Sequence, residues 1–174
     1  MTVSEMIEKY RIYLHSETQL GVKGSPSKAD LEEIKAHKPE IIAELVRREA
    51  DKKAAFEERE RKIHAIPGLD EIKAAMRDVA AWDREYDRRF DEYDVGSADM
   101  RPRPEYDIDA MLEQHPAAAA YIKADKAASS ANYEIASIGQ RALDAIIDDP
   151  DDYASAIDKM DAETKAFAER HMWD

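Results

Sequence analysis

The stretch that decides the fold is LDEIKAAMRDVAAWDREYDRRFDEY, residues 69–93. Its large apolar residues recur at steps of three and four, which is the period of one face of an α-helix. These residues are Leu69, Ile72, Met76, Val79, Trp82, Tyr86, Phe90 and Tyr93. The intervening positions are mostly charged, so the sequence predicts an amphipathic helix whose apolar stripe packs against other helices. The same stripe could instead close a homodimer, or present its aromatic residues to a partner.

The composition favours helices throughout the chain. Of its 174 residues, 37% are charged and 44% are hydrophobic, and only 5 are Gly and 7 are Pro. This balance suits helices with solvated outer faces better than sheets. We therefore expect a mainly α fold with a small N-terminal αββαα module, joined by a long charged helix to an acidic helical bundle.

Several classes of protein are excluded or disfavoured by what the chain lacks. With no cysteine, it cannot form disulfides, thiolate zinc sites or a thiol nucleophile. The N-terminal residues have no apolar signal core, and no run approaches the roughly 20 apolar residues of a membrane span. We expect a cytoplasmic protein that does not engage a membrane.

The first 46 residues form the predicted αββαα module. Ser4 is a candidate cap for a helix over 5–10, and residues 11–15 and 20–24 suit the two strands of a hairpin. Ser27 is a candidate cap for the next helix, and Pro39 suits the first turn of a second one. Residues 47–66 read as a charged connecting helix, rich in opposite charges three and four apart, which Pro67-Gly68 ends.

Residues 67–174 are expected to form the acidic bundle, built from 69–93, 107–148 and 151–171. Asp107 is a candidate cap for a short helix, and a long helix should run from Pro116 to about Asp148. Small residues in 127–131 would let a bulky neighbour, such as Trp82 or Phe90, pack over that helix. Pro150 should stop it, and Asp151 or Asp152 should cap the last helix.

No motif in the sequence indicates a reaction. The chain contains no HExxH, no G-x-S-x-G and no phosphate-binding glycine loop, and its five histidines are scattered. Asp83 and Asp87, four residues apart, could share a metal or a proton, although a solvated helix face explains them better. Arg101 and Arg103 flank prolines in the loop 94–105 and could grip a phosphate or a carboxylate. We expect a protein without enzymatic activity, cofactor or metal.

The negative charge lies entirely in the second part of the chain. Residues 1–66 contain 13 basic and 13 acidic residues, whereas residues 67–174 contain 13 basic and 26 acidic ones. Phosphate contacts need positive charge, so direct nucleic-acid binding by the second part is disfavoured. An acidic surface favours a basic partner, or simply good solubility.

The first 46 or so residues resemble the TubC-type N-terminal docking domain of tubulysin-type synthetase subunits. The resemblance lies in the hairpin around Tyr10–Gly24, the Ser-Pro-Ser turn at 25–27 and LEEIKAHKPEIIAEL at 31–45. The family motif corresponds here to Ile34, Lys35, His37, Lys38, Glu40 and Ile41. The resemblance implies an αββαα module whose second hairpin strand receives a partner's peptide, although no synthetase follows in this chain.

In general character the whole chain is similar to small acidic proteins of phages and other mobile elements, including anti-CRISPR proteins. This similarity implies a non-enzymatic inhibitor that binds a basic nucleic-acid-handling complex, such as a CRISPR effector nuclease. The expected contacts are Asp83, Asp87, Asp91, Glu92, Asp148, Asp149, Asp151 and Asp152. The alternative is a docking or scaffold adaptor that captures a partner peptide at the hairpin edge, through Leu20, Val22 and Lys23.

Overall fold

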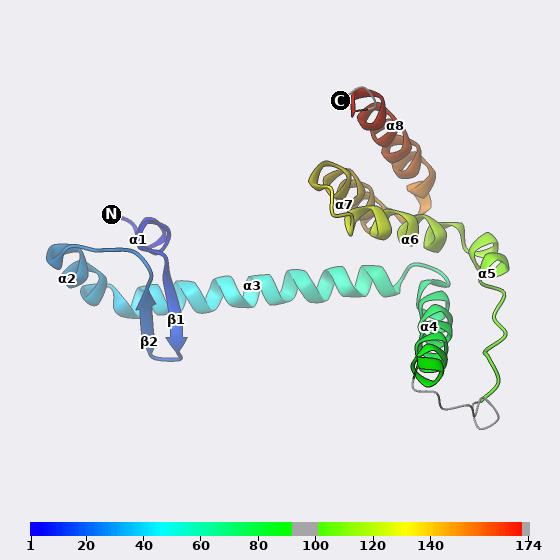
Figure 1. Cartoon of the computed structure of the whole chain (residues 1–174). Helices are drawn as coiled ribbons and strands as arrows, with labels where there is room; N and C mark the ends of the chain where they lie inside the picture. The colour runs from blue at the N-terminus through cyan, green and yellow to red at the C-terminus, as the bar shows by residue number, and fades with distance from the viewer. Residues whose placement is uncertain (92–100, 172–174) are drawn as a thin grey trace. The chain divides into compact units, whose positions relative to one another are not determined.

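The computed structural model describes residues 1–91 and 101–171 of the chain. Within these residues, one helix and a β-hairpin are followed by seven further α-helices and a short 3-10 helix (Figure 1). The predicted mainly α fold is confirmed. The chain divides into two compact units, Met1–Glu58 and Arg59–Asp174, and helix α3 (Lys38–His64) contributes residues to both.

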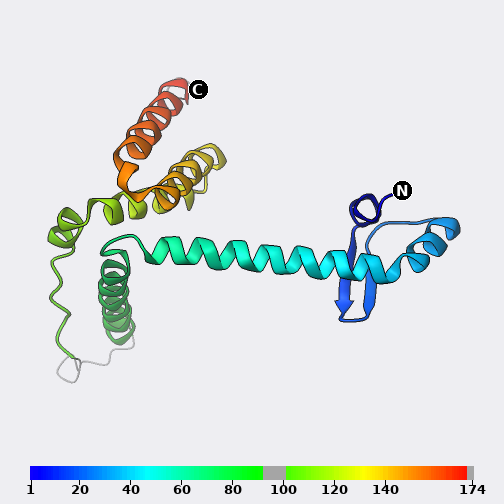
Figure 2. The ribbon, with the colours of Figure 1, turned by 180° about the vertical axis from the view of Figure 1, so that it is seen from behind.

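The first unit has the αββαα order that the sequence predicts. Its elements are α1 (Val3–Tyr10), β1 (Ile12–Ser16), β2 (Gln19–Val22), α2 (Lys28–Ala36) and the first half of α3. The two strands form an antiparallel hairpin that crosses the first turns of α3 in both views of the ribbon (Figures 1 and 2). Helix α3 begins at Lys38, one residue before the predicted start at Pro39.

Two capping boxes fix the starts of α1 and α2. The prediction for Ser27 is confirmed, because its hydroxyl accepts the backbone N–H of Asp30 at 3.2 Å while the Asp30 carboxylate accepts that of Ser27 at 2.9 Å. The prediction for Ser4 is wrong, because Thr2 caps α1. Glu5 lies three residues after Thr2 and accepts its backbone N–H at 2.8 Å, which completes the reciprocal pair.

Every element of the first unit contributes apolar side chains from one of its faces to a common core. Met6 of α1 and Ile41 of α3 are fully buried, and they are joined by Ile7, Tyr10, Ile12 and Ile34. From the hairpin, Leu20 and Val22 pack against this core while staying partly exposed. The hairpin therefore has a helical support, which a lone two-stranded sheet needs for stability.

The second unit is a set of helices around an aliphatic core. Its elements are the end of α3, α4 (Leu69–Asp91), α5 (Ile108–Gln114), α6 (Pro116–Ala128), α7 (Tyr133–Asp148), η2 (Pro150–Asp152) and α8 (Tyr153–His171). Ile66, Leu69, Ile72 and Ile146 are almost completely buried at its centre. The predicted break at Pro67-Gly68, the predicted start of a helix at Pro116 and the Asp107 cap are confirmed.

The predicted continuous helix from Pro116 to Asp148 is wrong, because the chain turns back after Ala128. Ser129 and Ser130 are poor helix formers, and Asn132 caps α7 by accepting the backbone N–H groups of Glu134 at 3.0 Å and Ile135 at 3.1 Å. The result is a pair of packed helices, α6 and α7, joined by a short turn.

Gly139 lets the backbones of α6 and α7 approach closely. A Cβ atom at Gly139 would lie 2.2 Å from the backbone nitrogen of Ala128. The small residues at the end of α6 are therefore matched by a glycine of α7. Trp82, predicted as a bulky neighbour over these small residues, is not among the side chains packed on the core that Ala127 and Ala128 border, and its indole N–H donates to the carbonyl oxygen of Arg101 instead. The side chain of Phe90, the other predicted neighbour, lies outside the described residues.

The apolar stripe of α4 is only partly used by the core. Leu69, Ile72 and Ala75 are buried, but Met76 is 41% exposed and Tyr86 is 42% exposed. Tyr93 lies outside the described residues. The start of the last helix also differs from the prediction, because Asp149 caps η2 and α8 follows directly from Tyr153, without a cap by Asp151 or Asp152.

Candidate partner-binding surfaces

The outer edge of strand β2 is the first candidate surface. The strands pair with Ile12 opposite Val22, Tyr13 opposite Gly21 and Leu14 opposite Leu20. The sheet contains only these two strands within residues 1–91 and 101–171, so each strand has one edge that no neighbouring strand covers. A strand edge with unpaired backbone groups is a ready template for another extended chain.

The register indicates which backbone groups β2 offers. Lys23 donates its backbone N–H to the carbonyl oxygen of Arg11 at 3.4 Å, so the N–H of Lys23 faces β1. In antiparallel pairing the inward groups belong to alternate residues, so Gly21 also faces β1 while Leu20 and Val22 direct their N–H and C=O groups outward. No other described segment forms a backbone hydrogen bond with Leu20 or Val22. The predicted residues Leu20 and Val22 thus supply the free groups of the edge.

The side chains around β2 give this edge two different faces. Leu20 and Val22 lie on the face that packs against the core. On the opposite face, the ring of Tyr13 lies across Gly21, where a Cβ would come within 2.2 Å of the Tyr13 ring. The Lys23 ammonium lies 5.3 Å from the centre of the same ring. The third predicted residue, Lys23, therefore places a positive charge at the end of the edge.

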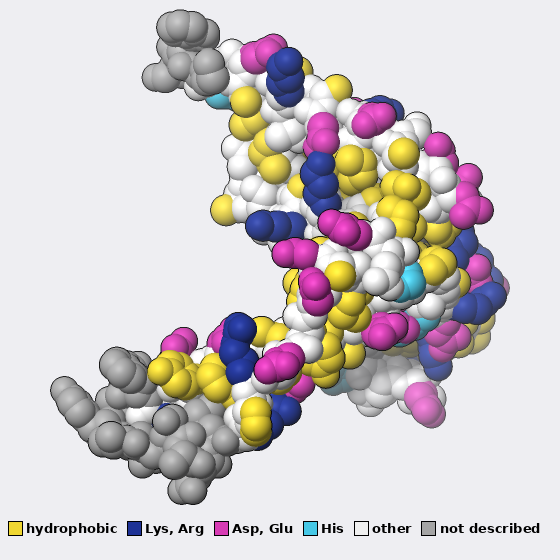
Figure 3. All heavy atoms as spheres, turned by 90° about the vertical axis from the view of Figure 1, so that its right-hand side faces the viewer, with side chains coloured by type: hydrophobic (Ala, Val, Ile, Leu, Met, Phe, Trp, Pro, Cys, Tyr) yellow, Lys and Arg dark blue, Asp and Glu magenta, His cyan; other side chains and the backbone are white. Residues whose placement is uncertain are grey.

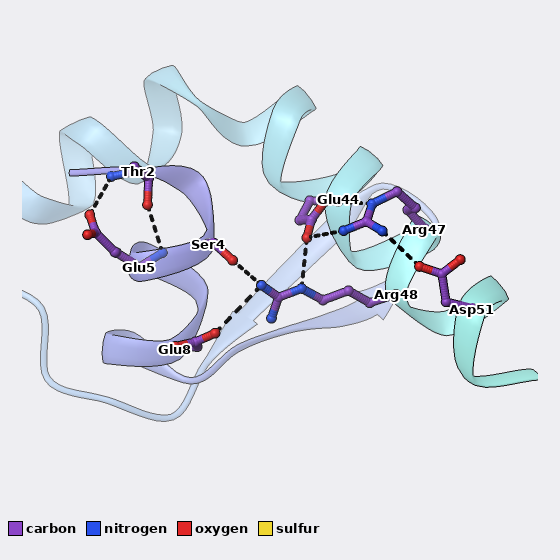
Figure 4. A network of polar contacts seen from close by, with 8 residues as sticks. All are labelled: Thr2, Ser4, Glu5, Glu8, Glu44, Arg47, Arg48 and Asp51. Carbon is purple, nitrogen blue, oxygen red and sulfur yellow. Dashed lines mark hydrogen bonds and ion pairs between the residues drawn. The ribbon is translucent and has the colours of Figure 1, made fainter. Parts of the chain in front are cut away.

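A polar network fastens α1, the hairpin's neighbour in sequence, to α3 (Figure 4). Arg48 of α3 reaches across to the Ser4 hydroxyl and lies 3.7 Å from the Glu8 carboxylate, and its Nε donates to Glu44 at 2.9 Å. Hydrogen bonds from Arg47 and Arg48 lower the pKa of Glu44 from its usual 4.5 to about 2. Glu44 is therefore ionised throughout the neutral range and orients both guanidinium groups.

The acidic residues predicted on α4 are not equivalent. Asp83 is paired with Arg103, whose Nε lies 3.2 Å from its Oδ1. Asp87 is exposed on the same helix and has no ion-pair partner in the described residues. The side chain of Asp91 and the whole of Glu92 lie outside the described residues. Of this group, Asp87 is the described carboxylate that remains available to a partner.

The acidic residues at the turn between α7 and α8 also differ in whether their carboxylates have partners within the chain. Lys62 lies 2.7 Å from Asp148 and donates a hydrogen bond that lowers the pKa of this carboxyl. Asp149 uses its side chain to accept the backbone N–H of Asp151 at 3.2 Å. Asp151 and Asp152 are exposed. On the face drawn in Figure 3, acidic side chains are scattered among basic and hydrophobic ones.

A surface that the sequence reasoning did not anticipate lies on α4, against residues 101–106. The two arginines predicted to grip a phosphate or carboxylate bind carboxylates of their own chain. Arg101 contacts Asp78 with 2.6 Å between Nη2 and Oδ1, and Arg103 contacts Asp83. Trp82 donates its indole N–H to the carbonyl oxygen of Arg101 at 2.9 Å. The alternation of Arg and Pro was the available signal, but it did not reveal which carboxylates these arginines meet.

The described residues hold no cluster of three His, Asp or Glu side chains placed to bind a metal ion. In particular, Asp83 is turned to Arg103 and is not joined with Asp87 in such a cluster. A small groove of about 70 Å³ lies between α7 and α8 and is lined by Ala142, Ala145, Ala156 and Met160 together with charged residues. One of the charged residues at its rim, Arg141, pairs with Glu163 across the two helices.

No helix in the described part of the chain combines the length and the apolar character needed to cross a lipid bilayer. Comparisons of the chain with protein-family models, curated proteins and solved structures find no match.

Proposed function

We propose that this protein is a non-catalytic adaptor that captures an extended peptide of a partner protein on the outer edge of β2. The observation that carries the proposal is the free set of backbone groups at Leu20 and Val22, on a hairpin that a helical core holds in place. Strand addition of this kind gains affinity from backbone hydrogen bonds and specificity from alternate side chains. The resemblance of residues 1–46 to docking domains supports the same role.

The geometry defines the expected peptide. It is extended, and it places apolar residues at alternate positions so that they continue the apolar face formed by Leu20 and Val22. The Lys23 ammonium favours a carboxylate near the end of the bound segment. Such peptides can be selected from a displayed library of random sequences against the immobilised full-length protein.

The decisive test is the variant Val22→Pro. Proline removes the outward N–H of residue 22, while the inward groups of Gly21 and Lys23 remain to pair with β1. The matched control is Leu14→Pro, which removes the outward N–H on the opposite edge of the hairpin. We expect the selected peptides to lose binding to Val22→Pro and to keep it with Leu14→Pro, with circular dichroism showing that both variants are folded. Equal binding by the wild type and Val22→Pro would refute the proposal.

A second candidate function rests on the excess of acidic residues in 67–174. Exposed carboxylates such as Asp87, Asp151 and Asp152 could compete with DNA or RNA for the basic groove of a nucleic-acid-handling complex, as an anti-CRISPR-like inhibitor does. The internal pairing of Asp83 and Asp148 reduces the charge available for this role.

The inhibitor hypothesis predicts that the wild type displaces duplex DNA from a purified CRISPR effector complex. The triple variant Asp87→Asn, Asp151→Asn, Asp152→Asn should displace less DNA. Displacement should also weaken as salt rises, since the Debye length falls from about 30 Å at 0.01 M to about 3 Å at 1 M. Equal displacement by the wild type and the triple variant would exclude this use of the acidic surface.

A further inference from the structure

We propose that the face of α4 formed by Asp78, Trp82, Asp83 and Tyr86 is a binding site for extended arginine- and proline-containing peptides of a partner protein. In this structure the chain's own residues Arg101–Tyr106 occupy it. This inference is independent of the strand edge of β2, because it rests on a different surface.

The aromatic part of this face is preorganised. The rings of Trp82 and Tyr86 are stacked, with centroids 5.2 Å apart and planes 15° from parallel. Their position one helical turn apart places them side by side on α4. Flat aromatic surfaces with an indole N–H at the edge are the typical receptors for proline-rich segments, since the indole donates to a backbone carbonyl that has no internal partner.

The acidic part of the face lies on either side of Trp82. Asp78 is one turn earlier and Asp83 is the next residue. Arg101 pairs with Asp78, and Arg103 pairs with Asp83 while its guanidinium carbon lies 5.9 Å from the centre of the Trp82 ring. The face therefore recognises two arginines separated by one residue, and it holds one of them over an aromatic ring.

The segment that occupies this face has the conformation that such a site requires. Pro102 and Pro104 have fixed φ angles near −65°, and the residue before a proline is restricted to extended geometry. All four residues of Arg-Pro-Arg-Pro are thus biased toward an extended chain before they bind. Tyr106 ends the contact, with its hydroxyl 3.5 Å from Asp78 Oδ2.

The internal segment is positioned to be replaced by a similar one. The Arg101 and Arg103 side chains are 57% and 58% exposed, and exposed ion pairs of this kind contribute little each. A partner peptide that carries the same pattern with additional contacts can displace it. The bound internal segment lowers the apparent affinity for that peptide, because only the open fraction of the protein can bind it.

The test measures the binding of a fluorescein-labelled peptide with the sequence of residues 101–106 to the full-length protein by fluorescence anisotropy. The double variant Arg101→Ala, Arg103→Ala weakens the internal segment and should bind the peptide roughly threefold to tenfold more tightly than the wild type. A labelled peptide with alanine at both arginine positions should not show this gain.

Two further variants, made in the double-variant background, locate the site. Asp83→Asn should weaken peptide binding roughly twofold to fivefold, since it removes the partner of one arginine. The matched control is Asp87→Asn, which removes a carboxylate of the same helix that the segment does not contact, and it should change binding less than twofold. Circular dichroism checks that each variant keeps its helices.

Two results would overturn the inference. The first is a double variant that binds the peptide no better than the wild type. The second is that light scattering shows the wild type to be a dimer and that the unlabelled peptide dissociates it. Residues 101–106 of one copy would then bind the α4 face of a second copy of this chain.

Discussion

Replacing Gly139 by alanine tests the packing that determines the second unit. The new Cβ would lie 2.2 Å from the backbone nitrogen of Ala128 and 2.5 Å from the backbone carbonyl carbon of Ala127. These neighbours are backbone atoms, so they cannot move aside by changing a rotamer. One of the two helices must shift, and the aliphatic core between them must repack.

The size of the effect follows from two opposing terms. Overpacking typically costs about 1–3 kcal/mol, and the backbone contacts place Gly139→Ala near the upper end of that range. Replacing glycine by alanine inside a helix otherwise stabilises it by about 1 kcal/mol. We therefore expect the variant to lower the free energy of unfolding of the second unit by about 2 kcal/mol, and its melting temperature by roughly 8 °C.

The assay must distinguish the two units of the chain, because a melt of the whole protein can combine two transitions. Native-state hydrogen exchange read by mass spectrometry does this peptide by peptide. Amides of α7 should exchange faster in Gly139→Ala, while those of α1 should not change. The adjacent exposed substitution Gln140→Ala is the control and should stay within about 0.5 kcal/mol of the wild type.

A second variant sharpens this test. In Gly139→Ala, Ala127→Gly, the contact of 2.8 Å with the Ala127 Cβ is removed, but the backbone contact at Ala128 remains. Glycine at position 127 also costs α6 up to about 1 kcal/mol, so the double variant should recover little or none of the lost stability. If Gly139→Ala proves as stable as the wild type, the close approach of α6 and α7 is refuted.

The remaining predictions concern a cap, an ion pair and the core. Asn132→Ala should cost the second unit about 1 kcal/mol, since it removes the acceptor of two backbone N–H groups at the start of α7, and hydrogen exchange of α7 would show it. The pKa of Glu44 is lowered from 4.5 to about 2 by Arg47 and Arg48, so its contribution to stability is present above about pH 4.5 and is lost as the pH falls toward 2. The stability difference between the wild type and Glu44→Gln, measured by urea unfolding, should therefore shrink over that range, and a constant difference would contradict the pairing. Ile146→Ala should destabilise the second unit by about 2–5 kcal/mol, because this side chain is fully buried, and a smaller loss in chemical denaturation would place it outside the core.

Most element boundaries could be predicted from local chemistry. Ser27 is followed three residues later by Asp30, Asp107 precedes an apolar run, and Pro116 sets the first turn of α6; each signal acts within a few residues of the boundary it marks. The αββαα order of the first unit also follows from local patterns. Thr2 and Ser4 both precede the first helix, and the glutamate three residues after Thr2 is the signal that favours Thr2 as the cap.

The break between α6 and α7 illustrates what local signals leave undecided. The apolar positions on either side of Ser129 and Ser130 keep a helical period, so the pattern is compatible with one long helix. The choice is made by packing, since a turn at this point allows Gly139 to meet the end of α6. Gly139 lies within a helical pattern, and Ser129 and Ser130 precede it by ten and nine residues. Each of these is a weak signal for a turn when it is considered alone.

The candidate surfaces were predictable to different degrees. The edge of β2 follows from the hairpin pattern, and the structure adds which residues, Leu20 and Val22, face outward. The acidic residues were identified by type, but their pairing with Lys62 and Arg103 depends on tertiary contacts. The aromatic half of the α4 stripe looks like core in the sequence, because periodicity does not say whether a partner helix reaches that far.

Strand β2 is short, and its length limits how tightly the proposed partner peptide can bind. Two outward residues offer four backbone groups, and at about 1 kcal/mol for each hydrogen bond they supply about 4 kcal/mol. This gain equals only the lowest estimates of the free-energy cost of the translational and rotational freedom that a peptide loses on binding. Side-chain contacts must therefore supply the remaining binding free energy. A peptide bound at this edge is expected to dissociate rapidly rather than to form a permanent complex.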